Sequence, residues 1–184
     1  MKYRNNEIPI KLRFKGDWVD HLKGEKWSFR VVVLGENTFK GLKSFSIQSP
    51  HTRTFIDEWF MHKIFKKEDI LTTRYEFIDV KLNNKQLGIY AYEEHFEKQL
   101  LESSNRREGP ILKFNEEGLW ETRFYKKFYN IPFPYFEAAE VIPFKKNKTL
   151  KNSTLNKNYK YATQLMLKYK ELNGNLNELF NLEK

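Results

Sequence analysis

The densest group of side chains that could carry out chemistry lies in a short polar stretch bounded by Gly16 and Gly24. Its Asp-x-x-Asp-His pattern contains residue types that ligate metals, but no second set of suitably spaced ligands occurs elsewhere. Glycine-flanked hairpins can also fold over phosphate groups, although this stretch is not a Walker-type loop. We favour a polar hairpin between two strands. The polar cluster formed by this stretch and the residues directly after it is Asp17, Trp18, Asp20, His21, Lys23 and Lys26.

Two adjacent acids, Glu93 and Glu94, follow an apolar strand pattern, where a carboxylate is held rigidly. Paired carboxylates can act as a general acid and base. Neighbours in an extended chain point to opposite sides, however, so at most one of the two faces any given site. The four histidines have no recognisable catalytic partners and there is no G-x-S-x-G motif, which disfavours serine-hydrolase chemistry. We interpret His62 as a helix-surface or packing residue.

The chain is basic, with 33 Lys and Arg against 24 Asp and Glu and a formal net charge of +9. Residues 141–170 contain eight lysines and no acid. Such an excess attracts polyanions or nucleotide phosphates, although we favour a solvated lysine-rich surface as its explanation. The absence of an RNP-type motif and of a zinc finger disfavours nucleic acid as a partner. The absence of cysteine excludes disulfides and thiol chemistry.

Length and composition narrow the class of protein further. A chain of 184 residues predicts one domain or two small lobes. Aromatic residues make up 16% of the sequence, which argues against general disorder. No apolar run approaches the length of a membrane span, and the opening residues lack the apolar core of a signal peptide. We therefore expect no transmembrane helix and no signal peptide in these residues, and the compartment stays open.

Periodicity predicts the elements that must position these residues. Alternation of apolar and polar residues indicates strands, and Asn83-Asn84 between two such runs indicates a hairpin turn. The first 110 residues therefore form an α+β pattern. The expected strands are residues 8–14, 27–34, 39–48, 75–82, 86–92 and 111–114, and the expected helices are residues 50–65, a short segment ending near 103, and residues 158–172.

The helix expected over residues 50–65 begins with Ser49 as its N-cap and Pro50 in its first turn. Apolar residues recur along it at helical spacing, so we expect this face to pack against the sheet. The residues expected in the core are Phe55 or Ile56, Trp59 or Phe60, and Ile64.

Four segments resemble the CotH (spore coat protein H) kinase-like family: KGDWVDHLKGEKWSFRV, FSIQSPHTRTFIDEW, VKLNNKQLGIYAYEEH and GPILKF. The resemblance covers roughly residues 10–114 and, more weakly, the helix near 160–180. Its most specific part is the hairpin, in which L-G-I-Y is followed by an acid three positions on. Asn84 stands where the family usually has glycine, and asparagine tolerates the left-handed conformation that such a turn requires.

The resemblance implies an α+β, atypical minimal protein-kinase-like fold. Two strands and their loop would cover the nucleotide phosphates, a third strand and a helix would follow, and two more strands would lead to a hinge. Residues 8–114 would form the N-lobe and hinge, with one packed helix. Residues 115–184 would form the start of the C-terminal lobe.

In kinase-like folds, a cation on an N-lobe strand holds the phosphates and pairs with a helix carboxylate. The resemblance implies Lys26 or Arg30 as the cation and Glu58 as the carboxylate. Lys15 and Lys23 add basic charge near the loop and would attract phosphate without specificity. We expect Glu58 or Glu94 to lie within ion-pair reach of Lys26, Arg30, Lys43 or Arg53. The implied cofactor-binding residues are Lys26, Arg30, Arg53, Glu58, Glu94 and Lys113.

The family's metal-binding and catalytic aspartates follow the helix near residue 180, in H-N-x-x-x-Y and W-D-x-D motifs that this sequence lacks. The resemblance therefore places the catalytic residues beyond Lys184, with no metal ligand in this chain, which looks truncated at both ends. The chain itself should be inactive, should bind ATP weakly and should gain little from Mg²⁺. The complete protein would use ATP and Mg²⁺ to phosphorylate Ser or Thr of a protein substrate. The alternative is a non-enzymatic binding or surface-assembly module with a kinase-like fold.

Overall fold

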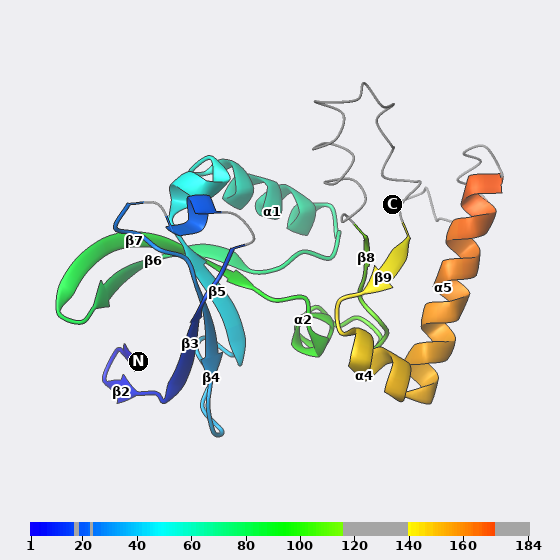
Figure 1. Cartoon of the computed structure of the whole chain (residues 1–184), viewed down its shortest axis with the longest axis horizontal. Helices are drawn as coiled ribbons and strands as arrows, with labels where there is room; N and C mark the ends of the chain where they lie inside the picture. The colour runs from blue at the N-terminus through cyan, green and yellow to red at the C-terminus, as the bar shows by residue number, and fades with distance from the viewer. Residues whose placement is uncertain (17–18, 23, 116–139, 172–184) are drawn as a thin grey trace. The chain divides into compact units, whose positions relative to one another are not determined.

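The computed structural model describes residues 1–16, 19–22, 24–115 and 140–171 (Figure 1). The chain divides into two compact units, residues 1–106 and residues 107–184, each with its own antiparallel sheet. The architecture is mixed α/β, with a mostly antiparallel sheet and a few helices. No helix in the described part of the chain has both the length and the apolar character of a membrane span.

The first unit is built on a five-stranded antiparallel sheet in the order β3-β4-β5-β7-β6. The helix α1 follows β5 in the sequence, so the order along the chain is three strands, a helix and two strands. This succession agrees with the sequence prediction, although β5 is much shorter than the strand expected over residues 39–48. The bounds are β3 Ile10–Phe14, β4 Phe29–Val33, β5 Ser44–Gln48, β6 Tyr75–Leu82 and β7 Lys85–Glu94.

The hairpin between β6 and β7 has the predicted two-residue turn. Leu82 pairs with Lys85, and Asn83 and Asn84 between them have φ values of 48° and 66°. Two consecutive left-handed residues produce the type I′ turn that matches the twist of the adjoining strands. Asn84 therefore adopts the left-handed conformation that the family's usual glycine at this position would also adopt.

One face of this sheet is apolar and carries the core of the unit. The small hairpin of β1 (Lys2–Tyr3) and β2 (Asn6–Glu7) contributes to it, since the Tyr3 ring makes an edge contact with Phe39 at 4.8 Å between centroids. Leu12 and Phe14 pair with Val31 and Phe29 on this face but are exposed, because β3 is an edge strand of the sheet. The buried core residues are Ile8, Val31, Val33, Phe39, Leu42, Phe45, Ile47, Tyr90 and Tyr92.

The prediction of a single helix over residues 50–65 with a buried apolar face is wrong in two respects. It is divided into a 3-10 helix, η2 (Pro50–Arg53), and α1 (Asp57–Lys67), because Thr54 and Phe55 have left-handed φ values of 48° and 62°. Its apolar face is also not in the core. Phe60 is 57% exposed and Trp59 is only partly buried. The other exposed members of the expected core face are Phe55, Ile56 and Ile64.

The physical reason is that α1 meets the sheet away from the apolar core. Its contact with β6 includes the His62 ring, which stacks on the Tyr75 ring with centroids 5.2 Å apart. Tyr75 pairs with Glu93 across the sheet, and cross-strand partners project to the same face. The side of α1 that carries His62 therefore faces the sheet, and the stripe with Phe55, Ile56, Phe60 and Ile64 stays exposed.

The remaining elements partly match the prediction. α2 (Lys98–Ser103) is the expected short helix that follows β7. In the second unit, β8 (Leu112–Phe114) pairs with β9 (Val141–Pro143), and α4 (Lys146–Lys151) precedes α5 (Ser153–Glu171). The strand near 111–114 is confirmed. The helix expected from residue 158 begins earlier, and α4 was not predicted.

Candidate functional site

A row of polar side chains crosses the face of the first unit's sheet opposite the core. The register places Arg13 opposite Arg30, Arg30 opposite Ser46, Ser46 opposite Glu93, and Glu93 opposite Tyr75. Because directly paired residues project to the same side, all five strands contribute to this row. We call this side of the sheet the polar face. It also carries Gln48, two residues along β5 from Ser46.

Lys15, just after β3, is held on the polar face by partners distant in sequence. Its Nζ donates to Glu93 Oε2 at 3.1 Å and to Gln48 Oε1 at 3.3 Å. Both the Lys15 and the Glu93 side chains are mostly buried. Sequence reasoning named Lys15 only as one of several basic residues near the loop. The available signal was its position at the end of a strand and directly before Gly16.

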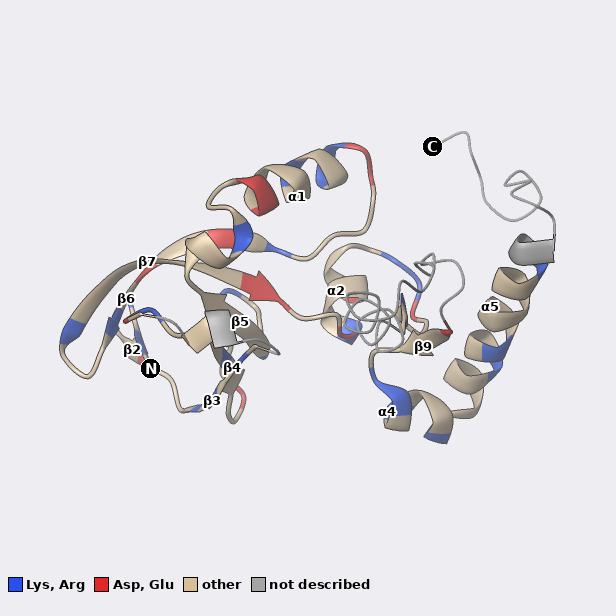
Figure 2. Ribbon diagram, turned by 45° about the horizontal axis from the view of Figure 1, so that its top comes forward, with Lys and Arg blue, Asp and Glu red and all other residues tan. Residues whose placement is uncertain are grey.

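The predicted ion pair of Glu58 is present at the start of α1. Arg53 Nε lies 3.7 Å from Glu58 Oε2, and His62 Nε2 lies 3.6 Å from Glu58 Oε1. The pKa of Glu58 is lowered below its ordinary value, chiefly by the hydrogen-bonding His62 ring and further by the charges of Arg53 and Lys15, whereas burial opposes this change. Figure 2 shows the acidic residues in red at the start of α1 and at the end of β7.

Glu58→Gln should make the stability of the protein less sensitive to acid. A carboxyl whose pKa is lowered on folding stabilises the native state fully above its unfolded pKa, here about 4.5, and loses this contribution as the pH falls through the folded value. Urea unfolding of both proteins between about pH 3 and pH 6 measures the difference. The wild type should lose stability more steeply below about pH 4.5 than the variant. Parallel curves would contradict the stabilising role of the charged form.

The cations expected to pair with Glu58 have other partners. Arg30 Nη2 lies 3.4 Å from Glu97 Oε1, just beyond the end of β7. Burial lowers the pKa of Arg30, as does neighbouring Arg13, while Glu97 raises it. Lys26 Nζ donates to the Ile89 carbonyl at 3.2 Å, toward the hairpin end of β7. Arg30 thus lies on the polar face with Lys15, whereas Lys26 contacts a different part of the sheet.

Glu94 does not belong to the polar face. As predicted for adjacent residues in a strand, it points away from Glu93, and the sheet pairs it with core residue Phe45. Its carboxylate accepts hydrogen bonds from Arg74 Nε at 2.9 Å and Nη2 at 3.0 Å, and from the Arg74 backbone at 3.2 Å. Side-chain hydrogen bonding to Glu94 and the charge of Glu94 raise the pKa of Arg74, whereas burial opposes this change. Sequence reasoning did not identify Arg74.

The last two sequence-derived sites contribute less to this arrangement. Lys113 belongs to β8 of the second unit, where its amine lies over the Phe144 ring at 5.7 Å from the centroid. In the polar stretch after Lys15, His21 Nδ1 is hydrogen-bonded with Ser28 Oγ at 2.9 Å. Asp17, Trp18 and Lys23 of that stretch lie outside the described residues.

The described residues contain no group of three or more His, Cys, Asp or Glu side chains that could hold a metal ion. The polar face does contain an unmet hydrogen-bonding group suited to an oxygen-rich ligand. Gln48 is fully buried, and its Nε2 makes no well-formed hydrogen bond among the described residues, although its side chain interacts with the Tyr75 hydroxyl and opposes the rise that burial causes in that group's pKa. Together with Lys15 and Arg30, it gives the polar face three donors for an anionic group.

Comparison with known proteins adds one finding. A family model described as CotH kinase protein matches residues 12–183. The match extends over nearly the whole chain and includes the polar face and the hairpin. A search of curated proteins found no match to this sequence.

Proposed function

Since the chain belongs to the CotH kinase protein family, we propose that it is part of an ATP-dependent protein kinase that phosphorylates Ser or Thr. In this proposal, residues 8–114 form a kinase-like N-lobe with its hinge, and residues 115–184 form the start of the C-terminal lobe. The succession of three strands, a helix and two strands supports this assignment. The polar face would hold the nucleotide phosphates.

The observation that carries the proposal is the position of Lys15. Protein kinases hold ATP phosphates with a lysine that an ion pair with a carboxylate orients. Here the Lys15 ammonium is oriented by Glu93 at 3.1 Å and by Gln48 at 3.3 Å. Glu58 on α1 is close enough for the charge of Lys15 to contribute to its lowered pKa. The arrangement thus combines a strand-end cation with carboxylates from a strand and from a helix.

The polar face provides the groups that a triphosphate requires. Lys15 and Arg30 supply positive charge, and Gln48 Nε2 is a buried donor without a well-formed hydrogen bond among the described residues. When bound, ATP would supply the terminal phosphoryl group, which passes to the acceptor oxygen as ADP leaves and the hydroxyl loses its proton. The described residues include no cluster of three or more His, Cys, Asp or Glu side chains that could ligate Mg²⁺.

Lys15→Met should weaken ATP binding about tenfold or more, because hydrogen bonds involving a charged group contribute about 1.5–3 kcal/mol. We expect the chain to bind ATP weakly, with an affinity that falls as salt rises and changes little with Mg²⁺. Calorimetric titration with ATP at low and at physiological salt measures this.

The matched control is Lys81→Met, which removes an exposed lysine from β6 and should leave the affinity unchanged. Equal binding by the Lys15 variant and the wild type would contradict the assignment of the phosphate site. ATP binding without phosphotransfer, even by the complete protein, would favour the alternative of a non-enzymatic module. Tight Mg²⁺-dependent binding would show that metal ligands lie within these 184 residues.

A further inference from the structure

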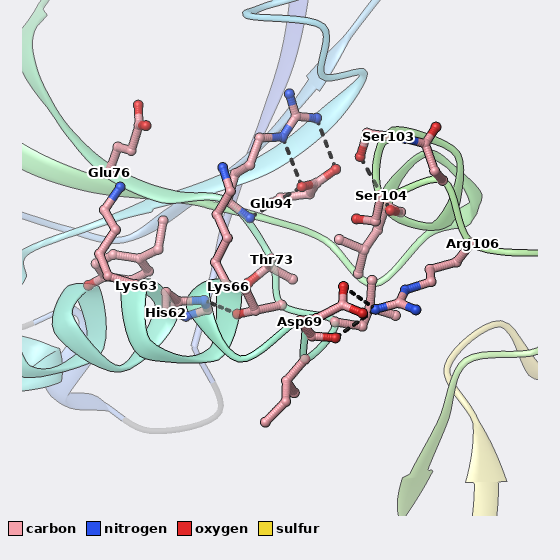
Figure 3. Close-up of a pocket in the computed structure, with 17 residues that line it drawn as sticks. His62, Lys63, Lys66, Asp69, Thr73, Glu76, Glu94, Ser103, Ser104 and Arg106 are labelled. Atoms are coloured by element: carbon pink, nitrogen blue, oxygen red, sulfur yellow. Dashed lines mark hydrogen bonds and ion pairs between the residues drawn. The ribbon is translucent and has the colours of Figure 1, made fainter. Parts of the chain in front are cut away.

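A pocket of about 490 Å³ lies in the first unit, where α1, the segment before β6 and the end of α2 meet. Its volume is within the range of small-molecule sites. Figure 3 shows Lys63 and Lys66 extending from α1, with Thr73, Glu94 and Arg106 among the other lining residues. Glu94 and Glu93 project to opposite faces of β7, and the Lys15, Arg30 and Gln48 side chains of the proposed nucleotide site are not among the residues that line this pocket.

The carboxylates of this pocket already have cationic partners. Glu94 is bound by Arg74 at 2.9 Å, and Asp69 by Arg106 at 2.6 Å. Glu76 contacts Lys40 at 3.2 Å and also accepts a hydrogen bond from the Tyr92 hydroxyl. The acidic groups of the pocket are therefore largely neutralised by these partners. The pKa of Glu76 is lowered chiefly by the Tyr92 hydrogen bond, and the charge of Lys63 also helps to lower it.

The lysines of the pocket are Lys63 and Lys66, one turn apart on α1. Residues three apart lie on the same side of a helix, and both of these line the pocket. The Lys63 amine lies over the Trp59 ring at 5.3 Å from its centroid, and neither lysine makes an ion pair within the described residues. The pocket therefore has two lysine amines on one wall, and its charged lining residues, four cations and three acids, leave a net positive charge.

Thr73 supplies a second, independent indication of a ligand. It is only 2% exposed and lines the pocket, yet its hydroxyl has no hydrogen-bond partner in the described part of the chain. A buried hydroxyl without a partner costs free energy, which an acceptor on a ligand would recover. A donor hydroxyl beside two amines fits a compact anion with several oxygen acceptors.

We propose that this pocket binds a phosphate monoester group, with Lys66 and Lys63 supplying charge and Thr73 a hydrogen bond. Phosphate monoesters carry up to two negative charges and three acceptor oxygens, which matches the two lysines and the free hydroxyl. The site is a second anion site, and it does not depend on the proposed function.

The test is a titration of the 184-residue chain with inorganic phosphate and, separately, with O-phosphoserine, followed by NMR shifts of the backbone amides. Both probes should shift amides of α1 and of residues 72–74. Lys66→Gln and Thr73→Val should each weaken binding about tenfold, because charge-assisted hydrogen bonds are the stronger class. Tighter binding of O-phosphoserine than of phosphate would identify a phosphorylated residue as the source, and the reverse order would identify free phosphate.

Two controls make the outcome decisive. Lys67→Gln removes the adjacent lysine, which does not line the pocket, and should leave binding unchanged. An equal loss in this variant would show general charge attraction and overturn the proposal, as would full binding by Lys66→Gln. The location of the shifted amides is the second control. Shifts confined to the polar face, around Gln48 and Glu93, would show that the anion binds there and that the pocket is not its site.

Discussion

Replacing Arg74 by methionine should lower the free energy of unfolding by about 3 kcal/mol, because Glu94 is then left buried without its cation. The Glu94 side chain is only 2% exposed and receives two hydrogen bonds from the guanidinium. Removing one partner of a buried pair costs about 3–5 kcal/mol. We expect the lower end of that range because Arg74 is itself 36% exposed, so water can partly take its place.

Urea unfolding monitored by circular dichroism measures the effect of this change. The control is Lys85→Met, which breaks the exposed Lys85–Glu25 pair at 2.8 Å and should cost less than about 1 kcal/mol. The double variant Arg74→Met with Glu94→Leu should recover much of the loss, because no unpaired charge stays buried. If the Arg74 variant is no less stable than the Lys85 variant, the pair does not support the end of β7.

Phe45→Ala should be the most destabilising single truncation in the first unit, at about 3–5 kcal/mol. Phe45 is 1% exposed, and its ring stacks on Phe39 with centroids 4.6 Å apart and contacts the edge of Tyr92. Truncation removes buried apolar surface and leaves a cavity in the middle of the sheet.

The informative comparison for this prediction is Phe60→Ala on α1, which should change stability by no more than about 0.5 kcal/mol because Phe60 is largely exposed. Thermal unfolding followed by calorimetry compares the two variants. Comparable losses of stability in the two variants would show that α1 packs into the core, as its sequence pattern predicted. The apolar face of α1 would then not be exposed.

Local signals in the sequence predicted the features that depend on neighbouring residues alone. The turn at Asn83-Asn84 was predictable because asparagine accepts the left-handed backbone that a two-residue hairpin requires. The opposite orientation of Glu93 and Glu94 followed from the two-residue period of an extended strand. The pair between Arg53 and Glu58 was within reach of sequence reasoning because the two residues are only five positions apart.

Features that depend on the register of distant strands were not predictable from the sequence. Lys15 meets Glu93 across 78 positions, and that contact exists only because β3, β4, β5 and β7 align in one order and register. Likewise, Arg74 reaches Glu94 only because β6, which begins at the next residue, pairs with β7.

The packing of α1 also could not be predicted from the sequence. Its spacing of apolar residues predicts which of them share a helix face, but not whether that face meets the core. The core lies on the other side of the sheet, between the strands and the N-terminal hairpin, so Phe60 stays exposed while His62 stacks on Tyr75. Periodicity determines which residues share a side of an element, and only the packing of elements determines which side is buried.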